Sequence, residues 1–319
     1  MSFVHEDNDF EQLLQVVAEA RRIEPALIEK DYWVTHTLWA LHQSGLEIWF
    51  KGGTSLSKGF GLIERFSEDL DLMVEAGPSA SLPRVASWTS TNAGPVAERR
   101  TFYAALESAL VVPGVRVELD ALRMDKYARS ADYLARYPGT LMDQLAPTMS
   151  PFVRLEVGRA RVVPCTPRAI SSFVHDHLEG KRILGGYTDN RPQSVRCVHP
   201  LVTLLEKLDA MARRYVRDQV DPAAFVRHYE DAAQIIRALA ALPTMDMTPE
   251  ALALDMLRSK DIAALPTVDE PALVLADPTR RAAVERAYRS ITPMFWGPRI
   301  PLDETCSIIR AWIGSALSS

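Results

Sequence analysis

The chain has 319 residues, of which 47% are hydrophobic and 24% charged, a composition typical of a globular protein that is long enough for two lobes. Three cysteines without CxxC spacing, Cys165, Cys197 and Cys306, argue against a disulfide framework and a zinc site, and they favour a reducing cytoplasm. No apolar run approaches the roughly 18 residues that span a bilayer. The acidic start, MSFVHEDNDFEQ, lacks the features of an export signal. We therefore expect a cytoplasmic protein without a membrane segment.

Positive charge is concentrated in the middle of the chain. Residues 121–217 contain 16 Lys or Arg and 9 Asp or Glu, whereas the whole chain has a net charge of -5. Such a stretch is expected of a surface that binds a polyanion, but solvated helix faces would give the same composition. Composition alone does not separate these two interpretations.

Hydrophobic periodicity predicts mixed helices and strands first, and then helices only. We expect early helices at 10–18, 25–43 and 96–110, and strands at 47–50, 69–74, 115–122 and 152–157. A short helical turn is expected around 56–63, and a loop rich in Gly, Pro, Ser and Thr at 76–95. Later helices are expected at 201–216, 223–239, 249–257 and 279–289. The pattern predicts a bilobed α/β (α+β) protein, with a lobe at 1–198 that contains a small mixed sheet and a helical lobe at 199–319.

A segment rich in tyrosine and arginine lies between two of the expected strands. It contains Arg123, Lys126, Tyr127, Arg129, Tyr133, Arg136 and Tyr137. One interpretation is that these side chains stack on RNA and neutralise its phosphates. The other is a helix in which the three tyrosines are partly buried.

The clearest chemical signal is a pair of aspartates preceded by a glycine turn. Strand alternation places the side chains of Asp69 and Asp71 on the same face, where their charges repel unless a cation neutralises them. Divalent cations such as Mg²⁺ prefer these oxygen ligands. Upstream, Gly52 and Gly53 allow close approach to a ligand, and Thr54 and Ser55 begin a helical turn whose N–H groups can hold phosphate.

These motifs, Lys51-Gly-Gly-Thr-Ser-Leu-Ser-Lys58 and Ser67-Glu-Asp-Leu-Asp71, resemble the signature of the polymerase-β-type nucleotidyltransferase superfamily. In particular they resemble the AbiEii/AbiGii toxin family, which includes the mycobacterial MenT toxins. Shorter matching pieces are Ile28-Glu-Lys-Asp-Tyr-Trp-Val34, Glu206-Lys-Leu-Asp209 and Arg227-His-Tyr-Glu-Asp231. The resemblance implies a polymerase-β-like N-terminal lobe and a helical C-terminal lobe.

The resemblance also implies roles for the matching residues. Gly52, Gly53, Thr54 and Ser55 would hold the triphosphate, and Asp69 and Asp71 would bind Mg²⁺ (or Mn²⁺). Lys207 would contact phosphate oxygens, and Asp231 would belong to the same catalytic site from the helical lobe. Without the resemblance, the favoured interpretation of Lys207 is an exposed lysine paired with nearby acids, and Asp231 could likewise cap or solvate a helix face. Ser67 matches a serine that related toxins carry phosphorylated. For a third metal carboxylate, Glu156 is the first choice, and Glu118 and Asp120 stay open as alternatives.

The implied reaction is the attack of a hydroxyl on the α-phosphate of an NTP, with release of pyrophosphate. In the family the hydroxyl is the tRNA 3′ end and the nucleotide is a pyrimidine, so that aminoacylation and translation stop, and a cognate antitoxin controls the toxin. One alternative is a transferase of the same fold that modifies a protein or small-molecule hydroxyl, including by phosphoryl transfer. Another is a non-catalytic module that binds nucleotide or RNA.

Overall fold

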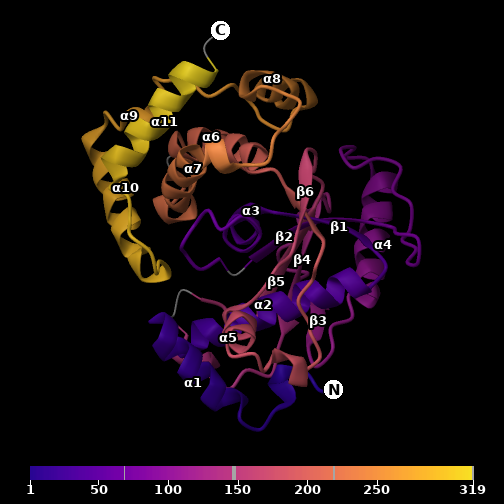
Figure 1. Ribbon diagram of the computed structural model, residues 1–319. Coiled ribbons are helices and arrows are strands. Elements are labelled where there is room, and N and C mark those ends of the chain that lie inside the picture. Colours follow the sequence, from indigo (N-terminus) through magenta and orange to yellow (C-terminus); the bar gives the residue numbers. More distant parts are fainter. Residues whose placement is uncertain (68, 146–148, 218–219, 318–319) are drawn as a thin grey trace. The chain divides into compact units, whose positions relative to one another are not determined.

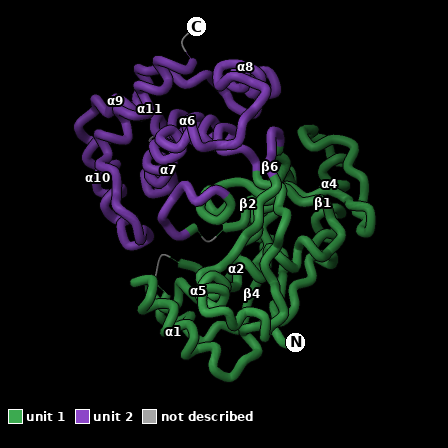
Figure 2. The backbone as a smooth tube through the Cα atoms, in the orientation of Figure 1, with its two compact units in different colours: residues 1–59, 67–162, 167–197 green, residues 60–66, 163–166, 198–319 purple. Residues whose placement is uncertain are grey.

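Figure 1 shows the computed structural model, which describes residues 1–67, 69–145, 149–217 and 220–317. The chain divides into two compact units, drawn in different colours in Figure 2. Unit 1 comprises residues 1–59, 67–162 and 167–197, and unit 2 comprises residues 60–66, 163–166 and 198–319. The chain therefore passes between the units several times rather than at one boundary.

A mixed sheet forms the centre of unit 1. Over the described residues it has seven strands in the order β3-β4-β5-β2-β1-β7-β6. Their bounds are β1 Glu47–Lys51, β2 Asp69–Glu75, β3 Arg116–Leu119, β4 Ser130–Arg136, β5 Val153–Gly158, β6 Cys165–Arg168 and β7 Val195–Val198. Strand β2 pairs antiparallel with β1 and parallel with β5, and β5 pairs antiparallel with β4.

Alternation along the central strands separates apolar from charged side chains. On β5, Val153, Leu155 and Val157 are buried, whereas Arg154 and Glu156 are partly exposed. On β2, the buried residues Leu70 and Leu72 alternate with the partly exposed Asp69 and Asp71. Because the side chains of paired residues lie on the same face, one face of β2, β5 and β4 presents charged groups.

The helices of unit 1 pack around this sheet. They are α1 Phe10–Arg21, α2 Pro25–Gln43, α3 Gly52–Thr54, α4 Ala93–Ala109 and α5 Phe173–Gly180, and a π-helical turn, Ser55–Gly59, follows α3. Helix α2 begins with Pro25 in its first turn, where the missing N–H costs no hydrogen bond, and it is buried along most of its length. It contacts β1 and β5 as well as α1 and α5, while α4 contacts β3.

Unit 2 is mainly helical. Its helices are α6 Pro200–Tyr215, α7 Arg227–Arg237, α8 Pro249–Ser259, α9 Pro271–Val274, α10 Pro278–Ser290 and α11 Leu302–Ala316. Helix α6 buries Leu201, Leu204, Leu205 and Leu208, the spacing expected of an amphipathic helix. It packs against α7, α8 and α9, and α7 packs against α11.

The predicted α/β fold class is confirmed, and most predicted elements lie within a few residues of their observed bounds. The helix considered for the tyrosine-rich segment is wrong, because residues 130–136 form strand β4 and hydrogen-bond to β3 and β5. The short strands β6 and β7 were not predicted. Among the described residues, no helix has both the length and the apolar character needed to cross a membrane.

Candidate active site

The glycine turn leaves β1 at Lys51 and lies directly against β2. Gly52 has φ +74°, and a Cβ at this position would be 1.6 Å from Asp71 Oδ2. Only glycine fits both the left-handed backbone and this close approach. The Thr54 hydroxyl donates to backbone carbonyls of the following segment, at 3.0 Å from Ser67 O and 2.7 Å from Asp69 O. The turn and the start of β2 are thereby held together.

The two hydroxyl residues of the motif, Thr54 and Ser55, differ in their hydrogen bonding. The Thr54 side chain is occupied with the backbone, so it is not directed toward a ligand. The Ser55 hydroxyl is buried and makes no hydrogen bond to any residue within the described ranges. Leaving such a group unsatisfied costs about 1–3 kcal/mol. Ser55 therefore has an unused donor and acceptor at the start of the turn.

Three carboxylates lie side by side on the charged face of the sheet. Asp71 is paired in register with Glu156 on β5, and Asp69 precedes Asp71 by two residues on β2. Asp132 on β4 faces Glu156 from the other side. Burial, together with the negative charges of Asp71 and Asp69, raises the pKa of Glu156 to about 7 from its ordinary value of 4.5. A cation at this place would relieve the repulsion.

The other two candidates for the third carboxylate lie farther along the sheet. Glu118 is on β3, which β4 and β5 separate from β2. It accepts a hydrogen bond of 2.6 Å from Arg136, and this contact lowers its pKa. Asp120 follows β3 and lies 3.2 Å from Arg154. Glu156 is therefore the candidate that the structure places next to Asp71.

Arg154 is a charged neighbour that the sequence reasoning missed. It is paired in register with Asp69, and its guanidinium lies 3.2 Å from both Asp120 and Asp132 and 3.9 Å from Asp69. Its position two residues before Glu156 places both side chains on the same face of β5. Asp132 was also missed, because its place on this face depends on recognising β4 as a strand.

These carboxylates fit a divalent cation by their chemistry, since hard cations prefer carboxylate oxygens. Burial and the negative charges of Asp71 and Asp69 raise the pKa of Glu156, and a cation would offset both effects. In the described part of the chain, however, no three His, Cys, Asp or Glu side chains are gathered closely enough to hold a metal ion.

The motif residue Ser67 lies just before β2, which begins at Asp69. Strand alternation therefore does not by itself place the Ser67 hydroxyl on the face of the carboxylates. Glu68, the next residue of the motif, lies outside the described residues.

A second group of charged side chains lies in the interior of unit 2. Asp231 on α7 is fully buried and accepts hydrogen bonds of 2.8 Å from Lys207 Nζ and from both Nε and Nη2 of Arg65. Burial alone would raise the pKa of Asp231, but Arg65 and Lys207 outweigh this effect and hold it far below its usual range. Asp231 is therefore ionised at any ordinary pH.

The pKa values of Lys207 and His228 are both lowered in this environment. Burial lowers the pKa of Lys207, an effect that Asp231 partly offsets. The His228 ring lies between two cations, with Nδ1 3.4 Å from Lys207 Nζ and Nε2 3.5 Å from Arg214 Nη1. Burial and the charge of Lys207 lower the pKa of His228 well below its usual value, so the ring stays neutral.

Arg65 was also missed by the sequence reasoning. Its segment is fixed by backbone hydrogen bonds, from Phe66 N to Met294 O at 2.7 Å and from Trp296 N to Glu64 O at 3.0 Å. Arg65 itself is 1% exposed. The only signal in the sequence was an arginine two residues before the Ser67 motif, and nothing in the local sequence indicates Asp231 as its partner.

The structure thus brings the predicted site residues together in two groups. Unit 1 contains the glycine turn, Ser67 and the three carboxylates, and unit 2 contains Lys207 and Asp231.

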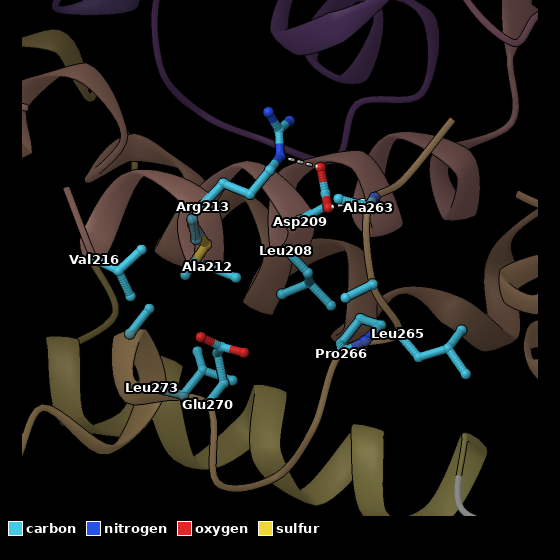
Figure 3. A pocket seen from close by; sticks show the side chains of 13 residues that line it. Leu208, Asp209, Ala212, Arg213, Val216, Ala263, Leu265, Pro266, Glu270 and Leu273 are labelled. Atoms are coloured by element: carbon cyan, nitrogen blue, oxygen red, sulfur yellow. Dashed lines mark hydrogen bonds and ion pairs between the residues drawn. The ribbon is translucent and has the colours of Figure 1, made fainter. Parts of the chain in front are cut away.

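A cavity of about 230 Å³ in unit 2 is separate from these groups (Figure 3). Its walls come mainly from apolar side chains of α6, α9 and the loop at 263–266, and Glu270 points into it. Burial raises the pKa of Glu270. None of the predicted site residues is among the described residues that line this cavity.

Comparison with known proteins identifies the family. No curated protein sequence matches the chain significantly. A family model described as "Nucleotidyl transferase AbiEii toxin, Type IV TA system" matches residues 37–295, which include the glycine turn, the three carboxylates, Lys207 and Asp231. This match covers well over half of the chain and confirms the resemblance found in the motifs. The chain therefore belongs to the AbiEii family of nucleotidyltransferase toxins of type IV toxin–antitoxin systems.

Proposed function

We propose that this protein transfers a nucleoside monophosphate from an NTP, preferably a pyrimidine nucleotide, to the 3′ end of tRNA. The modified end can no longer be aminoacylated, so translation stops. Family membership supports nucleotidyl transfer and a cognate antitoxin. The observation that carries the proposal is the group of Asp69, Asp71 and Glu156 beside a glycine turn, with the pKa of Glu156 raised to about 7.

The glycine turn is proposed to hold the triphosphate. Gly52 and Gly53 leave room for a phosphate to approach the backbone, and the first N–H groups of the helical turn donate to its oxygens. The unsatisfied Ser55 hydroxyl is available to donate as well. Thr54 contributes through its main chain, because its hydroxyl is bonded to the backbone around β2.

Asp69, Asp71 and Glu156 are proposed to hold Mg²⁺ or Mn²⁺. When bound, such ions would favour ionisation of the attacking hydroxyl and offset the charge of the departing pyrophosphate. The chain's own contribution is to present the carboxylates on two paired strands, so that their spacing is set by the sheet. Below about pH 7 Glu156 holds a proton, which it must release before all three carboxylates can act as ligands.

The helical part of the chain is proposed to supply the cation that meets phosphate. Lys207 is 7% exposed and is held by Asp231. We assign residues 1–198 to the nucleotidyltransferase lobe and residues 199–319 to the helical lobe that carries Lys207. Phosphorylation of Ser67 is proposed as a means of control, since a phosphate would add negative charge just before the carboxylate strand.

A surface cluster in unit 1 supports RNA as the acceptor. Lys126 Nζ and the Arg129 guanidinium each lie 4.8 Å from the centre of the Tyr127 ring. Both cations are exposed, which suits contact with a phosphate backbone. Tyr133 and Tyr137, which were also considered for stacking on RNA, are 0% and 4% exposed and belong to the core. Of the three tyrosines in this segment, Tyr127 is therefore the one proposed to stack on a base.

The test is incubation of the protein with each radiolabelled NTP, Mg²⁺ and total tRNA. We expect label at the tRNA 3′ end with one or both pyrimidine nucleotides and none with Asp69→Asn. Label on a protein or a small molecule would favour the same-fold alternative. Absence of any transfer, with nucleotide still bound, would indicate a non-catalytic module.

A further inference from the structure

The carboxylate of Asp231 has no capacity left for another ligand. Arg65 donates to it through two parallel N–H groups, Nε to Oδ1 and Nη2 to Oδ2, each at 2.8 Å. Lys207 Nζ donates to Oδ2 at 2.8 Å. Asp231 is 0% exposed. A bidentate arginine and a lysine around one buried carboxylate leave no open side for a metal ion and no basicity for proton transfer.

Lys207, by contrast, has hydrogen-bonding capacity left. Its ammonium group has three N–H donors. One donates to Asp231, and the second is directed toward His228 Nδ1 at 3.4 Å. The third makes no hydrogen bond to any residue within the ranges that the structure describes.

Several cations, together with the carboxylate of Asp231, surround Lys207 and its neighbour His228. Arg65 and Lys207 share the single carboxylate of Asp231, and two more cations, Arg227 on α7 and Arg214 on α6, act on Lys207 or on its neighbour His228. Because the His228 ring stays neutral and adds no charge, this group of cations suits the binding of an anion.

We infer that Arg65 is a positioning residue, which neutralises Asp231 so that Lys207 keeps one donor and its positive charge for a phosphate of the substrate. This inference rests on the proposed nucleotidyl transfer. In this arrangement Asp231 orients Lys207 through a single oxygen. Without Arg65, both oxygens of Asp231 would be available to Lys207. The negative charge of Asp231 would then cancel the positive charge of Lys207.

The test compares four proteins: the wild type, Arg65→Met, Asp231→Asn and the double variant. Methionine removes the charge of Arg65 while keeping a long unbranched chain, and asparagine keeps the shape of Asp231. Binding of inorganic tripolyphosphate is measured by calorimetry in EDTA, so that neither metal nor catalysis contributes. The KM and kcat for the NTP are measured in parallel.

We expect Arg65→Met to weaken tripolyphosphate binding at least tenfold and to raise KM more than it lowers kcat. The double variant should bind within about threefold of the wild type, because Lys207 is again free of an opposing charge. Arg65→Lys should recover part of the loss, since it restores the charge but not both parallel hydrogen bonds.

Arg299→Met is the matched control in the same unit. Arg299 Nε donates to the buried carboxylate of Glu230 at 2.5 Å, so its removal also leaves a buried acid without its arginine. This variant should lower the unfolding midpoint as Arg65→Met does, but it should leave tripolyphosphate affinity unchanged. An equal loss of affinity in both variants would show a general structural effect and overturn the inference.

Two further results would contradict the role of Arg65. One is affinity of Arg65→Met within twofold of the wild type. The other is a folded double variant that binds more weakly than Asp231→Asn and falls outside the expected threefold range of the wild type. This comparison does not use Arg65→Met, so it remains decisive even if that variant fails to fold. If the wild type transfers no nucleotide but its tripolyphosphate binding depends on Arg65, the proposed function fails and the inference stands. If transfer occurs and binding ignores Arg65, only the inference fails.

Discussion

Replacing Glu156 by glutamine should stabilise the metal-free protein at high pH. The folded protein holds the Glu156 proton up to about pH 7, whereas an unfolded chain releases it near pH 4.5. The folded state therefore binds more protons across this range, and stability falls as pH rises through it. At about 1.4 kcal/mol per pKa unit the full cost above pH 7 is about 3 kcal/mol, or about 2 kcal/mol once partial exposure of Glu156 is considered.

The assay is urea unfolding of wild type and Glu156→Gln in EDTA at pH 5 and pH 8.5. We expect the two proteins to differ little at pH 5, and Glu156→Gln to be more stable by about 2 kcal/mol at pH 8.5. The measured quantity is the difference in the free energy of unfolding between the two proteins at each pH. This comparison is needed because buried histidines make stability fall as the pH decreases, which is the opposite of the effect of Glu156. Burial and His36 lower the pKa of His5 to about 4, so its contribution is lost as pH falls below 6.5.

Glu118→Gln is the control for this experiment, because Glu118 is ion-paired with Arg136 and its pKa is lowered. It should bring no gain in stability at pH 8.5. Added Mg²⁺ should stabilise the wild type at pH 8.5 more than it stabilises Glu156→Gln. A Glu156→Gln protein no more stable than the wild type at pH 8.5 would refute the conclusion that burial and the neighbouring carboxylates disfavour ionisation of Glu156.

Six further variants test separate parts of the site. Asp69→Asn should abolish nucleotide transfer while leaving the thermal unfolding midpoint close to that of the wild type. Gly52→Ala should lower both activity and the unfolding midpoint, because its Cβ would meet Asp71 Oδ2 at 1.6 Å on a backbone with φ +74°. Ser67→Asp should inhibit strongly and Ser67→Ala should not; full activity of Ser67→Asp, with no phosphate found by mass spectrometry after coexpression with the antitoxin, would eliminate this means of control. Arg129→Ala should reduce the salt dependence of tRNA binding by about one in the log–log slope, as measured by filter binding, and Arg136→Ala should reduce it less because Arg136 donates to Glu118 at 2.6 Å.

The parts of the site that are local in sequence were predictable. The glycine turn and the aspartates of β2 lie within about 20 residues of one another, and alternation on a single strand is enough to place Asp69 and Asp71 on one face. The choice among Glu156, Glu118 and Asp120 was not predictable, because it depends on which strand pairs with β2. That pairing joins β2 to β5 across more than 80 residues, and no local pattern encodes it.

The same limit explains why Arg65 and β4 were missed. Arg65 meets Asp231 across 166 residues of sequence, so its role becomes visible only when α7 and the 60–66 segment are folded. The segment that became β4 contains charged and aromatic side chains that suit an RNA-binding surface as well as a strand. Tertiary pairing with β3 and β5 decided the outcome and took Tyr133 into the core.

The positive charge of the stretch at 121–217 is weaker evidence for RNA binding than its composition suggests. Several arginines inside the stretch form ion pairs with acids that lie outside it in the sequence. Four of its arginines are paired with acids that precede it: Arg136 with Glu118, Arg154 with Asp120, Arg159 with Glu75 and Arg196 with Glu47. The excess of positive charge in the stretch is thus partly balanced in the fold by acids outside it. The argument for an RNA acceptor then depends on the exposed cations Lys126 and Arg129 around Tyr127, and a tRNA-binding defect should follow their removal rather than the removal of paired arginines.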